Sequence, residues 1–349
     1  MNSRVELQDG TVCFGESFGA TRPVAGEVVF NTGMVGYPES LTDPSYRGQI
    51  LVFTYPLVGN YGVPSGRLSR LESDEVQVAG VIVAQFSRFH RHADADASLQ
   101  GWLRDADVPA ISGIDTRFLT RHLRAHGSML GKILPDDRDV AWSNPNDLNL
   151  LSEVSIKEPV ESGSGAKTVL LVDFGCKRSI ETSLLRRGFR VKRVPWNCCI
   201  SNEAADAVLL SNGPGDPRHY SGVIEQVALE LAGDRPVLGV CLGHQLMALA
   251  SGCEVFKLPY GHRGQNQPCR EVGTRRYFIT SQNHGYAVDL ATIDGVWLPW
   301  FENGNDGTCE GLRHSQKPHM SVQFHPEARP GPNDTAFVFD RFLELIHAK

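Results

Sequence analysis

A cysteine between two glycines, at the end of an apolar segment, is the first candidate for chemistry in this sequence. Cys241 lies in GVCLG (239–243), which ends the apolar run PVLGV (236–240) and leads into HQLMALAS (244–251). This pattern is typical of the sharp strand-to-helix turn G-x-S-x-G, with sulfur in place of the serine oxygen. A helix N-terminus would favour a thiolate and supply a donor for an oxyanion. A single cysteine is more often buried and inert, but this setting favours a nucleophile.

A thiolate nucleophile needs a base, and the segment SVQFHPE (321–327) offers one. His325 would transfer protons, while Glu327 would lie on the same side of an extended chain and orient the imidazole ring. A histidine before proline is more often a loop residue than a base. The other histidines therefore stay candidates, and His244 and His284 are the strongest competitors.

A loop rich in glycine and proline, SNGPGDP (211–217), follows another apolar run. A rigid loop of this kind can direct backbone N–H groups into a cleft, where losing one oxyanion donor typically costs about 100- to 1000-fold in rate. Taken alone, the segment is more simply a turn. It lacks G-x-x-x-x-G-K-[ST] and is a poor candidate for a phosphate-binding loop.

The elements that must position these segments begin near residue 168. Short apolar runs alternate there with amphipathic segments; the runs are TVLLVDFG (168–175), RVKRVP (190–195), AVLLS (207–211) and PVLGV (236–240). This alternation predicts a mostly parallel sheet covered by helices on both faces. Ligands bind at the carboxyl ends of the strands in such sheets. Cys241 and the 211–217 loop both follow predicted strands directly.

The first half of the chain has a different pattern. VELQDGTVCFG (5–15) predicts a hairpin that turns at Asp9 and Gly10, and further strand-like and helical segments follow. IKEPVESGSGAK (156–167) has the composition of a linker. The sequence therefore predicts a mixed α/β N-terminal domain over 1–155, a linker over 156–167 and a second domain over 168–349.

Composition excludes several classes of protein. The 349 residues are 41% hydrophobic and 21% charged, which suits two folded domains. A net charge of −6 opposes binding to nucleic acid, and no apolar run reaches the roughly 20 residues of a membrane helix. The start has no signal-peptide pattern, so we expect a cytoplasmic protein. Eight cysteines without a C-x-x-C pair predict reduced thiols rather than a zinc ribbon or a disulfide framework.

The three motifs together resemble the signature of class I glutamine amidotransferases, namely SNGPGDP, GVCLGHQ and HPE in this order. QNHGYAVD (282–289) and the long segment 26–62 further resemble the small, glutaminase subunit of carbamoyl phosphate synthetase. The resemblance implies an α/β protein with an N-terminal mixed α/β domain and a C-terminal doubly wound, mostly parallel sheet.

The resemblance also implies roles for individual residues. Cys241 would attack the side-chain amide of glutamine, His325 would protonate the departing ammonia and later activate water, and Glu327 would hold His325. The amides of Leu242 and Gly213 would form the oxyanion hole. Residues implied to bind the amino-acid end of the substrate are Ser45, Gly215, Gln245, Asn283, Gly285 and Tyr286. Tyr286 stands where the family often has phenylalanine.

The implied reaction is hydrolysis of glutamine through a thioester, with no metal or organic cofactor in this chain. The ammonia would pass to a large synthetase subunit, which would carry ATP and Mg²⁺ and dock on the N-terminal domain as a heterodimer or a higher assembly. The complex would make carbamoyl phosphate for arginine and pyrimidine synthesis.

Three alternatives remain open from the sequence. The chain could be another class I amidotransferase, a stand-alone amide hydrolase with the same turn, or a catalytically silent interaction subunit. The stand-alone hydrolase predicts activity that no partner changes. The silent subunit predicts that Cys241→Ala leaves a glutamine-dependent reaction of the complex intact.

Overall fold

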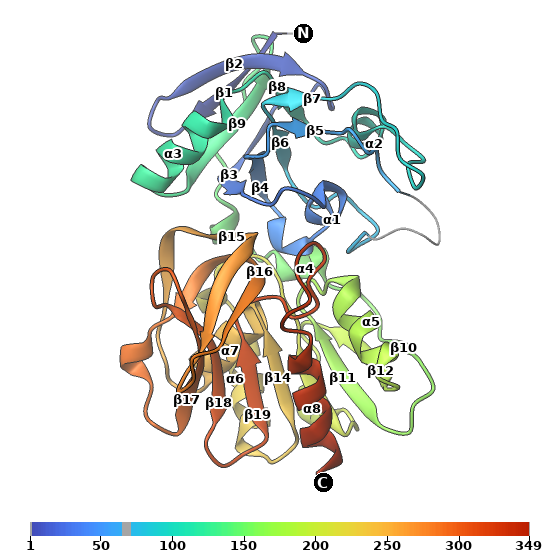
Figure 1. Cartoon of the computed structure of the whole chain (residues 1–349), viewed down its shortest axis with the longest axis vertical. Coiled ribbons are helices and arrows are strands. Elements are labelled where there is room, and N and C mark those ends of the chain that lie inside the picture. Colours follow the sequence, from blue (N-terminus) through green and yellow to red (C-terminus); the bar gives the residue numbers. More distant parts are fainter. Residues whose placement is uncertain (1, 65–70, 349) are drawn as a thin grey trace. The chain divides into compact units, whose positions relative to one another are not determined.

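The computed structural model describes residues 2–64 and 71–348, which belong to two compact units, Met1–Leu148 and Asn149–Lys349 (Figure 1). The division falls earlier in the chain than the predicted boundary at residue 155. Within the predicted linker, Val160–Ser162 forms strand β10, which pairs antiparallel with β12 (Arg190–Pro195). The polar composition of 156–167 therefore reflects an exposed edge strand as well as a connection.

The N-terminal unit is built on a closed barrel with the strand order β1-β2-β8-β6-β4-β3-β9. Its strands are β1 (Asn2–Leu7), β2 (Val12–Ser17), β3 (Val24–Asn31), β4 (Gln49–Phe53), β6 (Gly80–Ile82), β8 (Ala110–Ser112) and β9 (Met129–Pro135). A separate parallel pair consists of β5 (Leu57–Val58) and β7 (Gln85–Phe86). The helices of this unit are α1 (Tyr37–Leu41), α2 (Leu99–Asp105) and α3 (Thr116–His126).

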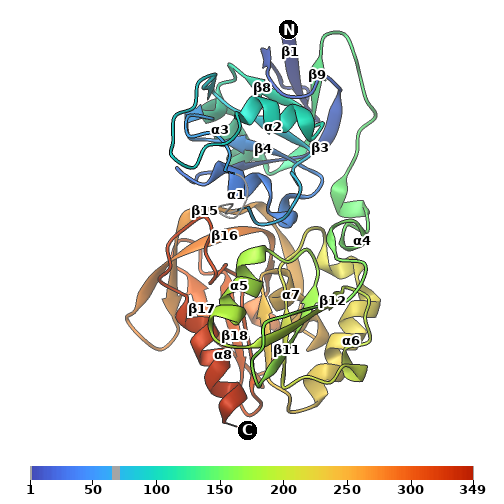
Figure 2. The same cartoon turned by 90° about the vertical axis from the view of Figure 1, so that its right-hand side faces the viewer.

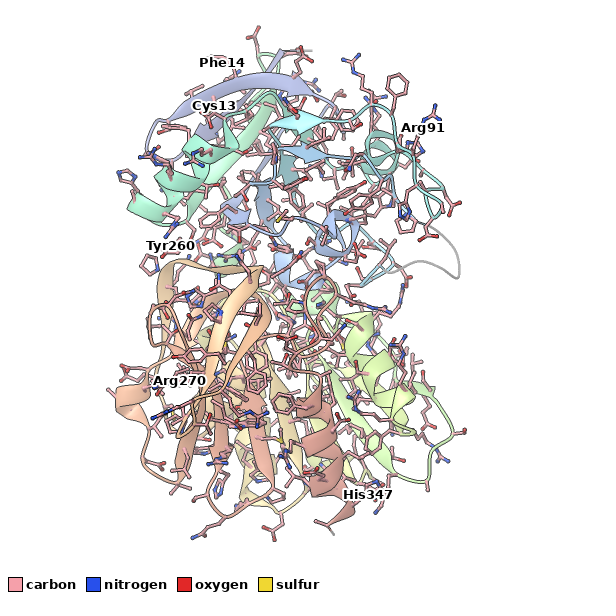
Figure 3. The ribbon with its side chains drawn as sticks, viewed as in Figure 1. Cys13, Phe14, Arg91, Tyr260, Arg270 and His347 are labelled. Atoms are coloured by element: carbon pink, nitrogen blue, oxygen red, sulfur yellow. The ribbon has the colours of Figure 1, made fainter. Side chains whose placement is uncertain are left out.

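The predicted hairpin is present as β1 and β2, whose antiparallel pairing runs from Asn2↔Glu16 to Glu6↔Val12. Side chains alternate along β2: Phe14 is 75% exposed, while its neighbour Cys13 is half-buried (Figure 3). This alternation is the period of two expected for a strand. The prediction of a mixed α/β N-terminal part is confirmed.

The C-terminal unit contains a ten-stranded sheet with the order β10-β12-β11-β13-β14-β19-β18-β17-β15-β16. The five strands from β12 to β19 in this order are parallel, and antiparallel strands extend the sheet at both ends. The strands not yet given are β11 (Thr168–Asp173), β13 (Ala207–Leu210), β14 (Val237–Val240), β15 (Val255–Glu271), β16 (Tyr277–Val288), β17 (Trp297–Asn303), β18 (Cys309–His314) and β19 (His319–Val322).

Helices cover both faces of the parallel strands, as the alternation of apolar runs predicts (Figure 2). These helices are α5 (Arg178–Arg186), α6 (Ser221–Ala232), α7 (Leu242–Ala250) and α8 (Phe337–His347), and α4 (Leu151–Val154) precedes the sheet. Leu170 and Val172 of β11 pack in one hydrophobic cluster with α6 and α7. Val169 and Leu171 pack in another cluster with α5 and α8. The doubly wound fold is confirmed, and it brings the carboxyl ends of the parallel strands to one edge.

Among the helices in the described ranges, none combines the length and the apolar character that crossing a membrane requires.

Candidate active site

Cys241 occupies the predicted sharp turn between β14 and α7. Its backbone has φ 54° and ψ −103°, a conformation that residues other than glycine rarely adopt. The Cys241 amide donates to the carbonyl of Val322 on β19 at 2.9 Å, and the residue is only 2% exposed. The turn therefore holds the thiol at the carboxyl end of the parallel sheet and at the N-terminus of a helix.

The flanking glycines are required by close backbone contacts. A Cβ on Gly243 would lie 2.2 Å from the carbonyl oxygen of Leu210, the last residue of β13. A Cβ on Gly239 would lie 2.6 Å from Met247 Sδ and 2.8 Å from the Gly243 carbonyl. These distances are shorter than normal contacts between non-bonded atoms. The helix can therefore pack this closely against the sheet only because residues 239 and 243 have no side chain.

His325 and Glu327 form a buried pair. His325 Nδ1 lies 2.6 Å from Glu327 Oε1, and the same oxygen lies 3.0 Å from the ammonium group of Lys177. Lys177 also donates to the carbonyl of Ala328 at 2.7 Å. His325 Nε2 makes no hydrogen bond of normal geometry with a described residue. The ring is thus oriented from its Nδ1 side, which leaves Nε2 for reactants.

The charges of this pair stabilise one another. Burial opposes the charge on His325, but Glu327 and Cys241 outweigh burial and raise the pKa of His325 to about 10. Burial also opposes the charge on Glu327, yet Lys177 and His325 lower the pKa of this carboxyl to about 2. The influence of Cys241 on the ring links the thiol to the His325–Glu327 pair.

The two competing histidines have other partners. Burial lowers the pKa of His244 to about 3, and its Nδ1 lies 2.8 Å from Ser321 Oγ. His284 Nδ1 lies 2.8 Å from the carbonyl of Tyr286. Of these three histidines, His325 is the one that combines a carboxylate partner with an influence of Cys241 on its pKa. The contact with Glu327 and the electrostatic influence of Cys241 therefore favour His325 as the base.

The thiol is further surrounded by residues of β16 and α7. Cys241 Sγ lies 3.7 Å from the carbonyl of Asn283 and 3.6 Å from Gln323 Nε2. Gln245 Nε2 donates to Gln323 Oε1 and to the Tyr286 carbonyl, each at 3.0 Å. The predicted site residues Gln245, Asn283 and Tyr286 therefore lie together around the sulfur.

Sequence reasoning missed two residues of this site. Gln323, which is fully buried, lies two residues before His325. Gln323 directly follows β19, which ends at Val322, so its spacing of two residues from the predicted base was the local signal for it. Lys177 follows β11, far from Glu327 in the sequence. No spacing rule indicates that ion pair, which arises from the order of strands in the sheet.

Gly213 and Leu242, whose amides are the predicted oxyanion donors, are in close contact. A Cβ on Gly213 would lie 2.2 Å from the Phe174 carbonyl and 2.8 Å from Leu242 Cδ2. The Leu242 amide is at the first position of α7, where a helix offers no internal acceptor. Gly215 has φ +89°, and a Cβ there would lie 2.4 Å from the Tyr220 hydroxyl. The 211–217 loop is therefore a tightly packed wall beside α7.

Asp216 connects this loop to β16. It accepts from Arg218 through Nε at 2.9 Å and Nη2 at 2.6 Å, and the Arg218 guanidinium lies 5.6 Å from the Tyr286 ring centroid. Burial opposes the charge on Asp216, but hydrogen bonds from Arg218, and a further one from Tyr286, lower its pKa. The Tyr286 hydroxyl, unexplained by the sequence, therefore has a partner in the loop.

The remaining predicted residues are Gly285 and Ser45. Gly285 lies on β16, where a Cβ would lie 3.2 Å from Arg263 Nη2. Ser45 belongs to the N-terminal unit, in the short 3₁₀ helix Pro44–Tyr46, and its amide donates to Asp43 Oδ1 at 2.9 Å. Ser45 therefore belongs to a different unit from the residues around Cys241.

Family models match both parts of the chain. Residues 5–133 match the carbamoyl-phosphate synthase small chain, CPSase domain, and residues 170–345 match glutamine amidotransferase class-I. These ranges agree with the two units of the structure.

Two kinds of curated protein are similar to this chain over nearly its whole length. The arginine-specific small chain of carbamoyl phosphate synthase from Debaryomyces hansenii is 46% identical over 361 residues, covering 97% of this chain and 84% of that protein. The multifunctional protein URA2 of Saccharomyces cerevisiae is 44% identical over 384 residues, covering 98% of this chain but 17% of that protein. The chain thus spans most of the first relative and about a fifth or less of the multifunctional ones. With both domain models and this identity over nearly its whole length, the chain belongs to the carbamoyl-phosphate synthase small chain family and carries a class I glutamine amidotransferase domain.

Proposed function

We propose that this protein is the glutaminase subunit of a glutamine-dependent carbamoyl phosphate synthetase. The observation that carries the proposal is the arrangement of Cys241 with the buried His325–Glu327 pair, in a chain that has both domains of the small-chain family. The substrate is L-glutamine, and the products are glutamate and ammonia.

The reaction proceeds by acyl transfer. The Cys241 sulfur, having given its proton to His325, attacks the side-chain amide carbon of glutamine, and the Leu242 and Gly213 amides bind the resulting oxyanion. His325 Nε2 returns the proton to the nitrogen, the C–N bond breaks, and ammonia leaves a glutamyl thioester. Water, deprotonated by His325, then attacks the thioester and releases glutamate. Glu327 keeps the ring oriented and stabilises its positive charge throughout.

The remaining roles depend on a partner. Ammonia released into neutral water would be protonated, so it is useful only when it passes directly to a synthetase. We propose a large partner subunit that carries ATP and Mg²⁺, with the N-terminal unit as the docking surface. A cytoplasmic location is supported by the eight cysteines, all in described residues and all free thiols, as a reducing compartment requires.

The test is Cys241→Ala in the purified complex with the large subunit. Synthesis of carbamoyl phosphate from glutamine should fall at least about 1000-fold, because the nucleophile is removed. Synthesis from added ammonium should be unchanged. The matched control is Cys253→Ala, since Cys253 is also a buried free thiol but belongs to the hydrophobic core; both activities should be retained.

Other outcomes would support the alternatives. Unchanged synthesis from glutamine in Cys241→Ala would indicate a silent subunit, and loss of both syntheses would contradict the proposed division of labour. Glutaminase activity that is unaffected by the partner, and equally fast on other amides, would indicate a stand-alone hydrolase.

A further inference from the structure

Three buried side chains that the proposed reaction does not use meet beside the active site. His262 on β15, His284 on β16 and Glu310 on β18 each offer a ligand atom, and these atoms all lie within 4.8 Å of one another. His262 and His284 are direct partners in the register of β15 and β16. Glu310 is fully buried, and its Oε2 has no hydrogen-bond partner in the described part of the chain. A buried carboxylate oxygen without a partner is costly and calls for an explanation.

The partners of the two histidines define which ring nitrogens are available. His262 Nε2 lies 2.8 Å from Asp306 Oδ2, and His284 Nδ1 lies 2.8 Å from the Tyr286 carbonyl. Because these oxygens only accept, we assign the hydrogen atoms to these two nitrogens. The opposite nitrogens face Glu310: His262 Nδ1 is 3.4 Å and His284 Nε2 is 4.0 Å from Oε1. Asn303 Nδ2 also lies 3.4 Å from His262 Nδ1, a long contact that a bound ion would replace.

The surroundings of His284 Nε2 also favour a cation. Gln282 Oε1 lies 3.2 Å from this nitrogen, while the amide nitrogen of Gln282 donates to Thr280 Oγ1 at 3.0 Å. Two acceptor oxygens, from Gln282 and Glu310, therefore face one ring nitrogen. This arrangement is favourable only when a positive ion, a metal or a proton, lies between them.

The groups that form hydrogen bonds with these three side chains are of the kind found around metal ligands. A histidine that binds a metal almost always donates its other N–H to a carboxylate or a backbone carbonyl. Here His262 has the carboxylate partner and His284 has the backbone carbonyl. The carboxylate is held as well, because Asn303 Nδ2 donates to Glu310 Oε1 at 2.9 Å. Two histidines and one glutamate are a known ligand set for zinc.

We propose that His262 Nδ1, His284 Nε2 and the Glu310 carboxylate bind one divalent transition-metal ion, for which Zn²⁺ is the best match, with water as the fourth ligand. Zinc bonds to nitrogen and oxygen of about 2.0–2.2 Å place tetrahedral donors about 3.3 Å apart. The His262–Glu310 separation of 3.4 Å already fits. The His284–Glu310 separation is 4.0 Å and all three ligand atoms lie within 4.8 Å of one another, so these side chains would have to move closer together around the ion. The resemblance implies no metal in this chain, so the proposed site goes against that expectation.

The ion would stabilise the wall of the active site rather than take part in the reaction. His284 lies next to Asn283, whose carbonyl contacts Cys241 Sγ, and it binds the Tyr286 carbonyl that also accepts from Gln245. An ion joining β15, β16 and β18 would fix this segment. Because it binds the native state, it should also raise the midpoint of thermal unfolding.

The experiment uses the full-length protein, stripped with a chelator and then incubated with ZnCl₂ or CoCl₂. After gel filtration, we expect one Zn²⁺ per chain and a higher midpoint of thermal unfolding. The Co²⁺ form should show the visible bands of tetrahedral coordination without a strong thiolate-to-cobalt band, which excludes binding to the cysteines. All readouts are independent of glutaminase activity, so failure here would leave the proposed function intact.

Variants locate the ion. Glu310→Gln should weaken Zn²⁺ binding at least about 100-fold, and Asp306→Asn, which removes the support of His262, about 10- to 100-fold. The Asp306 side chain is 41% exposed, so the second variant should fold even when Glu310→Gln does not. The control is His126→Asn on α3, which breaks up the pair of exposed His126 and half-buried His122, a place for adventitious zinc. This variant should still retain one ion.

Three results would overturn the proposal. They are loss of all zinc on gel filtration, equal affinity of the wild type and the folded Asp306→Asn variant, and a Co²⁺ spectrum dominated by thiolate ligation. In each case the cluster would hold a proton, not a metal.

Discussion

At the scale of single residues, the buried charges around His325 depend on one another. Glu327 Oε1 is shared between His325 Nδ1 and Lys177, so neither cation is buried without a counter-ion. The network keeps the imidazole oriented and charged where ammonia must be protonated. It also makes the stability of the protein depend on pH.

Glu327→Gln tests that dependence. The lowered pKa of Glu327 contributes stability that is present above pH 4.5 and is lost as the pH falls toward about 2. The raised pKa of His325 contributes stability that is present below pH 6.5 and is lost as the pH rises through about 10. The variant should therefore be less stable by about 3 kcal/mol near pH 5.5, the cost of breaking a buried pair.

The difference in unfolding free energy between the wild type and Glu327→Gln should shrink as the pH rises from 7 toward 10. Urea unfolding at several pH values would measure it. Glu344→Gln is the control, because its partner Arg341 is exposed and screened by solvent. A loss of stability that stays constant from pH 5.5 to pH 10 would contradict the assigned roles of the pair.

The hydroxyl group of Tyr286 has a partner that the sequence does not predict. This hydroxyl interacts with Asp216 of the 211–217 loop and with Arg218, which directly follows the loop, while the Tyr286 carbonyl accepts from Gln245. Tyr286→Phe should release the loop from β16. We expect the KM for glutamine to rise about fivefold, as for the loss of one hydrogen bond of about 1 kcal/mol, with kcat nearly unchanged.

Steady-state glutaminase kinetics would measure this effect. Tyr277→Phe is the matched control, since Tyr277 lies on the same strand but is 58% exposed, and its KM should not change. An unchanged KM in Tyr286→Phe would mean that the hydroxyl does not position the loop.

At the scale of elements, the close approach of α7 to the sheet decides where the nucleophile lies. Gly243→Ala would place a methyl group 2.2 Å from the Leu210 carbonyl, a backbone atom that cannot rotate away. Either α7 or β13 must shift, which should cost about 2 kcal/mol or more and displace Cys241. Glutaminase activity and the free energy of unfolding should both fall.

Gly222→Ala is the control for this change. Gly222 lies in α6, where an added Cβ would meet nothing within 4 Å. Alanine is the better helix former, so this variant should gain up to about 1 kcal/mol in unfolding free energy and keep full activity. A Gly243→Ala variant as stable and active as Gly222→Ala would show that the turn tolerates a side chain.

The long hairpin of β15 and β16 was not predicted from the sequence. It supplies Asn283, Gly285 and Tyr286 to the site and His262 and His284 to the proposed metal site. Its sequence mixes glycine, histidine, glutamine and asparagine, so no clean alternation of apolar residues marks it as a strand. Its polar side chains are buried because they bind one another, which only the folded sheet reveals.

At the scale of the whole molecule, the chain divides into two units, each with its own core. The change from mixed hairpins to alternating apolar strands and helices indicated two domains, but not the position of the division. The segment before β11 is polar and exposed, and the sequence could not show that Val160–Ser162 pairs with β12.

Three features could be predicted from the chain alone, namely the order of the motifs, the strand-to-helix turn at Cys241 and the pairing of His325 with Glu327, because they depend on neighbours a few residues apart. The folded structure was needed to show that Lys177 completes the charge network, that Gln323 contacts the sulfur and that His262, His284 and Glu310 converge. These contacts join residues that are distant in the chain. They follow from strand order and register, which local residue patterns do not encode.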